Sequence, residues 1–373
     1  MVEDILGWLV ACPSVVGTPN GPITQRIADH CRAHGATVRI LPGPEGDRAN
    51  LFATLGPAEA PGYVLSGHTD VVPADESGWS ADPFVLRRDG DRLYGRGTTD
   101  MKGFLACALA ALPALAAMDL KWPIHLAFSY DEEAGCRGVP HMIAALPGLC
   151  RRPLGVVVGE PSGLQGVLAH KGKAAARLEV TGVSGHSSRP DLGRNAVHAM
   201  TGVLAEALAQ GRALEAGPSD ARFEPATSSL QIGLVKGGRA LNVIPDHCSA
   251  EIEVRAISGV SPRALLEPVR RRLDALAADG FGTAWQELSA YPALALDADS
   301  ALAGLVADLT GRASRPAVSY GTEAGLFQEA GLEAIICGPG DIARAHRPDE
   351  YITRGELDAC LAMILSLGER LRA

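Results

Sequence analysis

The chain has 373 residues, of which 47% are hydrophobic and 21% are charged, so it can form one large or two ordinary domains with a substantial core. Its formal net charge of −9 and the lack of a long basic run argue against binding to a nucleic-acid backbone. We expect no membrane span, because Pro113 interrupts the short alanine-rich run 105–117, and no signal peptide, because residues 1–4 lack a basic start. Eight cysteines without a Cys-x-x-Cys pair indicate reduced, mostly buried thiols in a cytoplasmic protein.

The first half of the chain alternates short apolar runs with helical periodicity. Helices are expected at 5–11, 23–34, 101–117 and 139–146, and strands at 37–41, 51–55, 63–66, 124–129 and 154–158. This alternation favours an α/β fold in which helices cover both faces of a sheet. In such sheets ligands gather at the carboxyl ends of the strands, and polar motifs follow these apolar runs.

Near residue 171 the pattern changes to a clean two-residue alternation. A strand is expected at 175–180, followed by a helix at 196–209, strands at 229–235 and 249–255, and a helix at 262–278. We therefore predict an α+β domain over residues 172–283, inserted into an α/β domain formed by residues 1–171 and 284–373. A strand is expected at 334–337 and a helix at 354–371, which continues the α/β domain.

Several short motifs place imidazoles or carboxylates where the apolar runs end. The side chains concerned are those of His68, Asp70, Asp100, Glu132, Glu133, Glu160 and His346. Taken singly, each has an ordinary explanation, such as a helix N-cap for Asp100 or an acidic turn for residues 131–133. Together, two imidazoles and several carboxylates without thiolates are the ligand set of a zinc-type two-metal hydrolytic centre.

Two of these motifs also suggest supporting roles. Residues 68 and 70 share a face of an extended chain, so Asp70 can fix the tautomer of a metal-bound His68. The adjacent carboxylates of Glu132 and Glu133 point in different directions. One of them can bind a metal while the other holds a water as general base.

The motifs resemble those of a known family. Segments 68–73, 95–103, 131–133 and 159–162 are similar to the dinuclear-zinc aminoacylase and carboxypeptidase family, which includes acetylornithine deacetylase and succinyl-diaminopimelate desuccinylase. The segments that resemble acetylornithine deacetylase more closely than its relatives are 168–172, 185–188, 321–324, 338–340 and 346–351. The resemblance implies a mixed-sheet, two-metal aminopeptidase-like catalytic domain at 1–171 and 284–373, and a ferredoxin-like dimerisation or lid domain at 172–283.

The resemblance also implies a role for each site residue. Asp100 would bridge two divalent ions, Zn²⁺ with Co²⁺ as the alternative, and the Asp100–Met101 peptide would be cis. One ion would also bind His68 and Glu160, and the other Glu133 and His346. Asp70 would orient His68, and Glu132 would be the general base.

The inserted domain would make a homodimer and present His186 to the partner subunit's active site, as a further catalytic residue. Contacts to a small N-acyl amino acid would come from Asn242, Arg255, Glu323 and Gly338, with no nucleic acid or membrane as partner. Arg255 would hold the substrate carboxylate, for which a bidentate guanidinium is well suited.

The expected reaction is hydrolysis of the N-acetyl amide of an amino acid, foremost N2-acetyl-L-ornithine, to L-ornithine and acetate, a step of arginine biosynthesis. Alternatives with the same metal site are a succinyl-diaminopimelate desuccinylase, a broad N-acyl-amino-acid deacylase and a small-dipeptide peptidase. A catalytically inactive amino-acid- or peptide-binding homologue is the alternative outside the enzymes, and the presence of Glu132 and of every expected ligand speaks against it.

Overall fold

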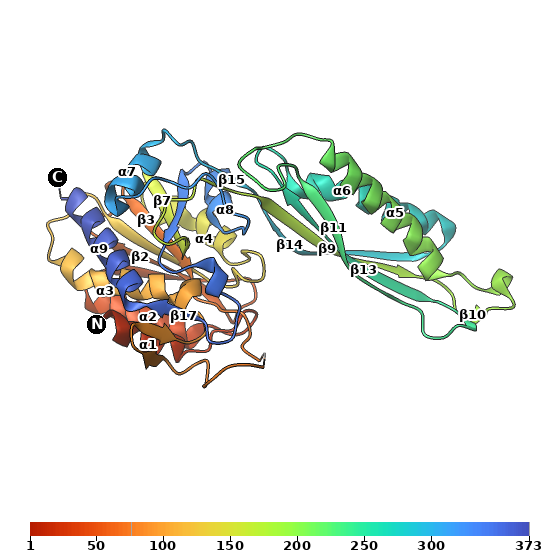
Figure 1. Cartoon of the computed structure of the whole chain (residues 1–373), viewed down its shortest axis with the longest axis horizontal. Helices are drawn as coiled ribbons and strands as arrows, with labels where there is room; N and C mark the ends of the chain where they lie inside the picture. The colour runs from red at the N-terminus through yellow and green to blue at the C-terminus, as the bar shows by residue number, and fades with distance from the viewer. Residues whose placement is uncertain (76, 373) are drawn as a thin grey trace. The chain divides into compact units, whose positions relative to one another are not determined.

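The computed structural model describes residues 1–75 and 77–372, which form two compact units (Figure 1). The first unit consists of Met1–Ala169, Leu294–Ala317 and Thr322–Ala373, and the second of His170–Ala293 and Val318–Gly321. The described cysteines are all free, and most of them are buried.

The first unit is built on a six-stranded mixed sheet of order β1-β2-β6-β3-β7-β16. Its strands are β1 (Thr37–Pro42), β2 (Ala49–Leu55), β3 (Tyr63–His68), β6 (Ile124–Ser129), β7 (Gly155–Pro161) and β16 (Ala334–Gly338). β3, β6, β7 and β16 run parallel to one another, whereas β1 and β2 form an antiparallel edge. The parallel strands are buried almost throughout, which is why they read as continuous apolar runs. Their carboxyl ends share one edge of the sheet.

Helices cover both faces of this sheet, as Figure 1 shows for α3 and α9 on one side and α4 and α8 on the other. The helices of the unit are α1 (Val2–Val10), α2 (Gly21–Ala33), α3 (Gly103–Ala116), α4 (Val139–Ala145), α7 (Ala301–Thr310), α8 (Ala324–Glu329) and α9 (Arg354–Arg370). α3 is apolar all round because α1, α2, α9 and the sheet enclose it. By length and hydropathy Thr98–Ala116 could cross a bilayer, but 83% of its most apolar window is buried inside the protein.

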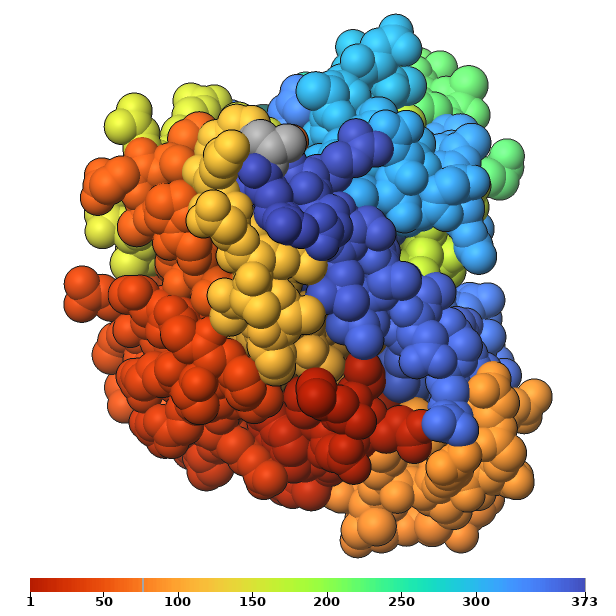
Figure 2. Space-filling view, turned by 90° about the vertical axis from the view of Figure 1, so that its left-hand side faces the viewer, coloured from red at the N-terminus to blue at the C-terminus, as the bar shows by residue number. Residues whose placement is uncertain are grey.

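The C-terminal segment of the chain packs against its first third in this unit. Figure 2 shows the C-terminal residues (blue) against the N-terminal residues (red) and the segment near residue 110 (orange to yellow). α9 packs along α3, and the backbone N–H of Lys121 donates to the carbonyl of Leu371 at 2.8 Å. Short strands complete the unit. One small sheet is formed by β4 (Arg87–Asp89), β5 (Arg92–Tyr94) and β17 (Tyr351–Thr353). A strand pair is formed by β8 (Ala169–His170), which begins in this unit, and β15 (Leu294–Ala295), which lies within it.

The second unit is an α+β fold with one four-stranded antiparallel sheet of order β11-β13-β9-β14. In chain order its elements are β9 (Gly172–Thr181), α5 (Ala196–Glu215), β11 (Ser229–Gly237), β13 (His247–Ala256), α6 (Pro262–Ala275) and β14 (Gly282–Tyr291), with the short pair β10 (Gly185–His186) and β12 (Val243–Ile244). The order β-α-β-β-α-β is that of a ferredoxin-like fold. The expected fold class, a mixed-sheet α/β domain with an inserted ferredoxin-like module, is therefore confirmed.

The end of the second unit differs from the boundary expected at residue 283. β14 pairs with β9 from Gly282 to Tyr291, so the strand continues well past that point. Gly280 has φ +79° and ends the helical turn Leu276–Asp279, and the chain then continues directly into β14 of the same unit. The assignment of catalysis to one domain and of dimerisation to the other stays a prediction.

Candidate metal centre

The carboxyl edge of the parallel strands carries all the residues predicted to bind metal. His68 is the last residue of β3, and Glu160 lies near the end of β7. Glu133 follows β6, and Asp100 lies in the turn Thr98–Lys102, where the Asp100–Met101 peptide is cis as expected. His346 follows the short helix Ile342–Arg344 and has a left-handed backbone with φ +57°.

The two carboxylate oxygens of Asp100 face two different imidazoles. Oδ1 lies 3.1 Å from Nε2 of His68, which in turn is 3.7 Å from Oε1 of Glu160. Oδ2 lies 3.4 Å from Nε2 of His346, which is 3.0 Å from Oε1 of Glu133. We call His68 and Glu160 the inner half-site, and Glu133 and His346 the outer half-site, with Asp100 shared between them.

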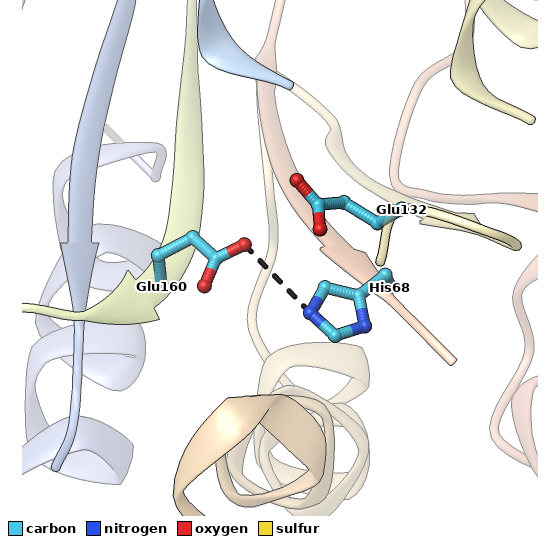
Figure 3. A group of neighbouring side chains, drawn as sticks. All are labelled: His68, Glu132 and Glu160. Atoms are coloured by element: carbon cyan, nitrogen blue, oxygen red, sulfur yellow. Dashed lines mark ion pairs between the residues drawn. The ribbon is translucent and has the colours of Figure 1, made fainter. Parts of the chain in front are cut away.

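Glu132 lies beside the inner half-site. Ligand atoms of His68, Glu132 and Glu160 all lie within 4.8 Å of one another, as do those of His68, Asp100 and Glu133. Figure 3 shows the carboxylates of Glu132 and Glu160 turned toward the imidazole of His68 from two directions. Burial, together with the neighbouring carboxylate of Glu133, raises the pKa of Glu132 to about 8 although His68 acts in the opposite direction.

The charges of this cluster fit divalent cations. The carboxylates outnumber the imidazoles, and burial together with Asp100 raises the pKa of Glu160 well above its usual value. Burial acts against the charged form of His68, but its contacts with Asp100 and Asp70 raise its pKa overall. Hydrogen bonds to Asp100 and Glu133 raise the pKa of His346 to about 10. Excess negative charge at buried oxygen and nitrogen donors is what a pair of divalent metal ions compensates.

Asp70 makes a different contact from the one expected. Nδ1 of His68 lies 2.9 Å from the backbone carbonyl of Asp70, whereas the Asp70 carboxylate is 3.6 Å away. The carbonyl therefore fixes the tautomer with the proton on Nδ1, which leaves Nε2 to face Asp100. The carboxylate instead accepts the backbone N–H groups of Glu132 and Glu133, each at 3.1 Å.

The neighbouring Asp131 also stabilises the loop that follows β6. It is buried, has φ +51°, and accepts hydrogen bonds from the backbone N–H of Gly17 at 2.7 Å and from the guanidinium of Arg48. Residue 131 lies in the acidic motif, but the sequence offers no signal for these partners.

Glu350 is a buried residue of the site for which the sequence motifs predict no role. Its carboxylate accepts the backbone N–H groups of Gly97, Thr99 and Asp100 at 2.9, 2.8 and 3.0 Å. The guanidinium of Arg96 donates to the same carboxylate at 3.0 Å. Glu350 therefore shapes the turn that presents Asp100. Its only sequence signal is its place in segment 346–351.

Glu323 and Gly338, expected to contact substrate, have packing roles in the first unit. The buried carboxylate of Glu323 accepts the hydroxyls of Ser66 at 2.6 Å and Ser129 at 2.7 Å, and so ties α8 to the ends of β3 and β6. A Cβ on Gly338 would lie 1.9 Å from the carbonyl oxygen of Gly159, so the absent side chain lets β16 approach β7.

The remaining predicted residues belong to the second unit. β10 and β12 pair His186 with Val243, and the backbone N–H of Ser187 donates to the carbonyl of Asn242 at 3.1 Å. Nδ1 of the exposed His186 accepts the backbone N–H of Ser188 at 3.2 Å and lies 2.7 Å from the Ser188 hydroxyl. Arg255 donates to Glu253 at 2.7 Å and lies 3.4 Å from the hydroxyl of Tyr291.

The arrangement has the parts of a hydrolytic centre. It combines oxygen and nitrogen donors around a shared aspartate with a buried carboxylate of raised pKa beside them. The fold and the site thus define a metal-dependent hydrolase.

The comparisons with known proteins agree with this class. A profile of peptidase family M20/M25/M40 matches residues 64–370, so the chain belongs to this family. It is 32% identical to an acetylornithine deacetylase of Photorhabdus laumondii subsp. laumondii, over 94% of this chain and 91% of the relative. An acetylornithine deacetylase of Myxococcus xanthus is 34% identical over 95% of this chain and 93% of its own. The protein is a metal-dependent amidohydrolase.

Solved structures show the same fold at lower identity. An M20 family metallo-carboxypeptidase from Sulfolobus solfataricus has a TM-score of 0.80 at 18% identity, covering 100% of this chain and 99% of that one. A dinuclear metal binding peptidase of the M20 family from Bacillus subtilis has a TM-score of 0.68 at 16% identity. The match covers 99% of this chain and 97% of that one.

Proposed function

We propose that the protein hydrolyses N2-acetyl-L-ornithine to L-ornithine and acetate, as a step of arginine biosynthesis. The observation that carries this proposal is the similarity to acetylornithine deacetylases along nearly the whole of both chains. The free, mostly buried cysteines support a reducing compartment, and we place the reaction in the cytoplasm.

Two divalent ions, Zn²⁺ foremost, would be held by the inner and outer half-sites and bridged by Asp100. The donor set supports this choice, because imidazole and carboxylate ligands without thiolates suit zinc in hydrolytic sites. When bound, such ions lower the pKa of a coordinated water and polarise the substrate carbonyl.

Glu132 would then move the proton. Its carboxylate accepts a proton from the attacking water, whose oxygen bonds to the acetyl carbon. The same group returns the proton to the amine nitrogen as the carbon–nitrogen bond breaks. Burial raises the pKa of this carboxyl, which favours a group that takes up a proton and then returns it.

His186 would stabilise the oxyanion from the partner subunit of a homodimer formed through the second unit. The orientation of its ring supports this role, because Ser188 engages Nδ1 and an N–H at Nε2 can donate to a developing negative charge. Asn242, adjoining His186, and Arg255 would contact the substrate, with Arg255 binding its carboxylate. Glu323 and Gly338 would also contact the substrate, from their places at the strand ends of the first unit.

The test is a panel of substrates given to purified protein with measured metal content. The panel contains N2-acetyl-L-ornithine, N-succinyl-diaminopimelate, N-acetylmethionine and a dipeptide, with Glu132→Gln as the inactive control. We expect the highest kcat/KM for acetylornithine. A higher value for the succinyl compound, for acetylmethionine or for the dipeptide would replace the proposal by the desuccinylase, broad deacylase or dipeptidase activity, respectively.

A further inference from the structure

The carboxylate of Glu132 has an unexpected neighbour in the thiol of Cys136. Sγ of Cys136 lies 3.2 Å from Oε1 of Glu132, in the geometry of a hydrogen bond donated by the thiol. Within residues 1–75 and 77–372, this is the one hydrogen bond found for the Glu132 carboxylate. The Cys136 side chain is only 1% exposed, so water does not compete for the contact.

A tight turn brings the thiol back to this position. The carbonyl of Glu132 accepts the backbone N–H groups of Gly135 and Cys136, both at 2.8 Å. Gly135 and Cys136 have φ values of +95° and +59°, so the chain reverses within these residues and places residue 136 over residue 132. Left-handed backbone at a residue with a side chain is uncommon, and here it aims that side chain at the carboxylate.

The charged groups around Glu132 explain why its carboxylate needs a hydrogen-bond donor. The nearby carboxylates of Glu133, Asp70 and Glu323 all act against the negative charge of Glu132 and would turn its side chain away. Burial and the same acidic neighbours raise the pKa of the Cys136 thiol well above its usual value, so the sulfur keeps the proton that it donates.

We infer that Cys136 is a positioning residue that holds the carboxylate of Glu132 beside the metal centre through an S–H···O hydrogen bond. The inference rests on the proposed function, in which Glu132 is the general base. It adds that the orientation of this base depends on a thiol that itself touches neither substrate nor metal.

A pair of substitutions tests the role. Cys136→Ala removes the donor, whereas Cys136→Ser keeps a donor, and both retain one Cβ at the left-handed position. We expect kcat to fall about 10-fold in Cys136→Ala, with KM changed less than about 2-fold and metal content unchanged, and to recover most of its value in Cys136→Ser. Cys31→Ala and Cys31→Ser are the matched controls, because Cys31 is equally buried in α2 and is not among the residues of the site. Both controls should leave kcat unchanged.

Two kinetic results would overturn the inference: a wild-type kcat in Cys136→Ala, or an equal loss in the alanine and serine variants with the same fall in Tm. Failure of the proposed function looks different, because wild-type protein would then leave acetylornithine intact. In that case the same comparison of kcat is made on whichever compound of the panel is hydrolysed.

An infrared measurement needs no substrate and can be made on metal-free protein. The S–H stretching band of Cys136 is identified as the band lost in Cys136→Ala. We expect this band to move to higher frequency in Glu132→Ala, since the acceptor is gone. An unchanged band would show that the thiol does not donate to Glu132 and would refute the inference.

Discussion

The inner and outer half-sites offer the same types of side chain as ligands but are built in different ways. His68 and Glu160 come from adjacent parallel strands, and their side chains are 1% and 5% exposed. His346 comes from a loop, and its side chain is 51% exposed. The sheet therefore fixes the inner half-site, whereas the outer one depends on how the loop before β17 is held. We expect this difference to appear in how firmly each half keeps its ion.

The largest effect is expected at Glu132, the proposed general base. Glu132→Gln keeps the shape of the side chain but removes the base, so kcat should fall by about 10²- to 10⁴-fold. Both ions should stay bound, because none of the proposed ligands is changed. Kinetics with metal analysis on the same sample check this, and appreciable deacetylase activity in the variant would remove Glu132 from the role of base.

The next effect separates the two halves directly. In His346→Ala we expect one ion to be lost and the other kept, with activity reduced roughly 100-fold, because the inner ligands are untouched. In His68→Ala both ions should be lost and Tm should fall, since Asp100 and Glu160 are left as buried carboxylates without the imidazole. Metal content after gel filtration measures the outcome. If His346→Ala released both ions, the two halves would not be independent.

A smaller effect is expected from Glu350, which holds the turn around the shared Asp100. In Glu350→Gln one oxygen is replaced by an N–H₂ group that faces N–H donors, so the turn should loosen and metal affinity should fall about 10-fold in both halves. Glu251→Gln is the matched control, because Glu251 pairs with Arg177 in the sheet of the second unit. It should lower Tm without changing metal affinity. If metal affinity fell in only one half-site, Glu350 would not act through the shared Asp100.

The sequence alone could predict most of the first unit, because its parallel strands are buried on both faces. The run at 124–129 coincides with β6, and the helix expected at 354–371 differs from α9 by one residue. Strands of three residues, such as β4 and β17, are too short to show a periodicity. β14 is not among the predicted strands, and the boundary expected at residue 283 cuts through it.

For the candidate site, residue types and their places at strand ends could be predicted, but not the atoms in contact. The carbonyl of Asp70, rather than its carboxylate, bonds the ring of His68, because the carboxylate is engaged by backbone N–H groups beyond β6. The sequence motifs predict no role for Glu350 or for Cys136. The first acts on a turn some 250 residues away in the chain, and the second depends on a local left-handed backbone that no pattern of residue types reveals.

The last prediction concerns the stability of the metal-free protein, in which the surroundings shift the pKa values of several groups of the site. The pKa of Glu132 is raised to about 8, that of Glu350 to about 7 and that of His346 to about 10. Each folded group keeps a proton that the unfolded chain has lost, so its stabilising contribution is present at low pH and disappears as the pH rises through the folded pKa.

Between about pH 7 and about pH 8.5, the Tm of chelated protein should therefore fall. Lys102, whose pKa burial lowers to about 8, acts in the opposite direction in this window, and so, near pH 7, do His125 and His170 with pKa values lowered to about 4. These groups are outnumbered by those whose pKa values are raised, which also include His68 and Glu160. The fall should be smaller in Glu132→Gln and in His346→Ala, and smaller still in metal-loaded wild type, whose carboxylates are compensated. Thermal unfolding at several pH values measures it. A chelated Tm that rises with pH would mean that these groups are not held together without metal, and the two half-sites would then be formed by the ions rather than by the fold.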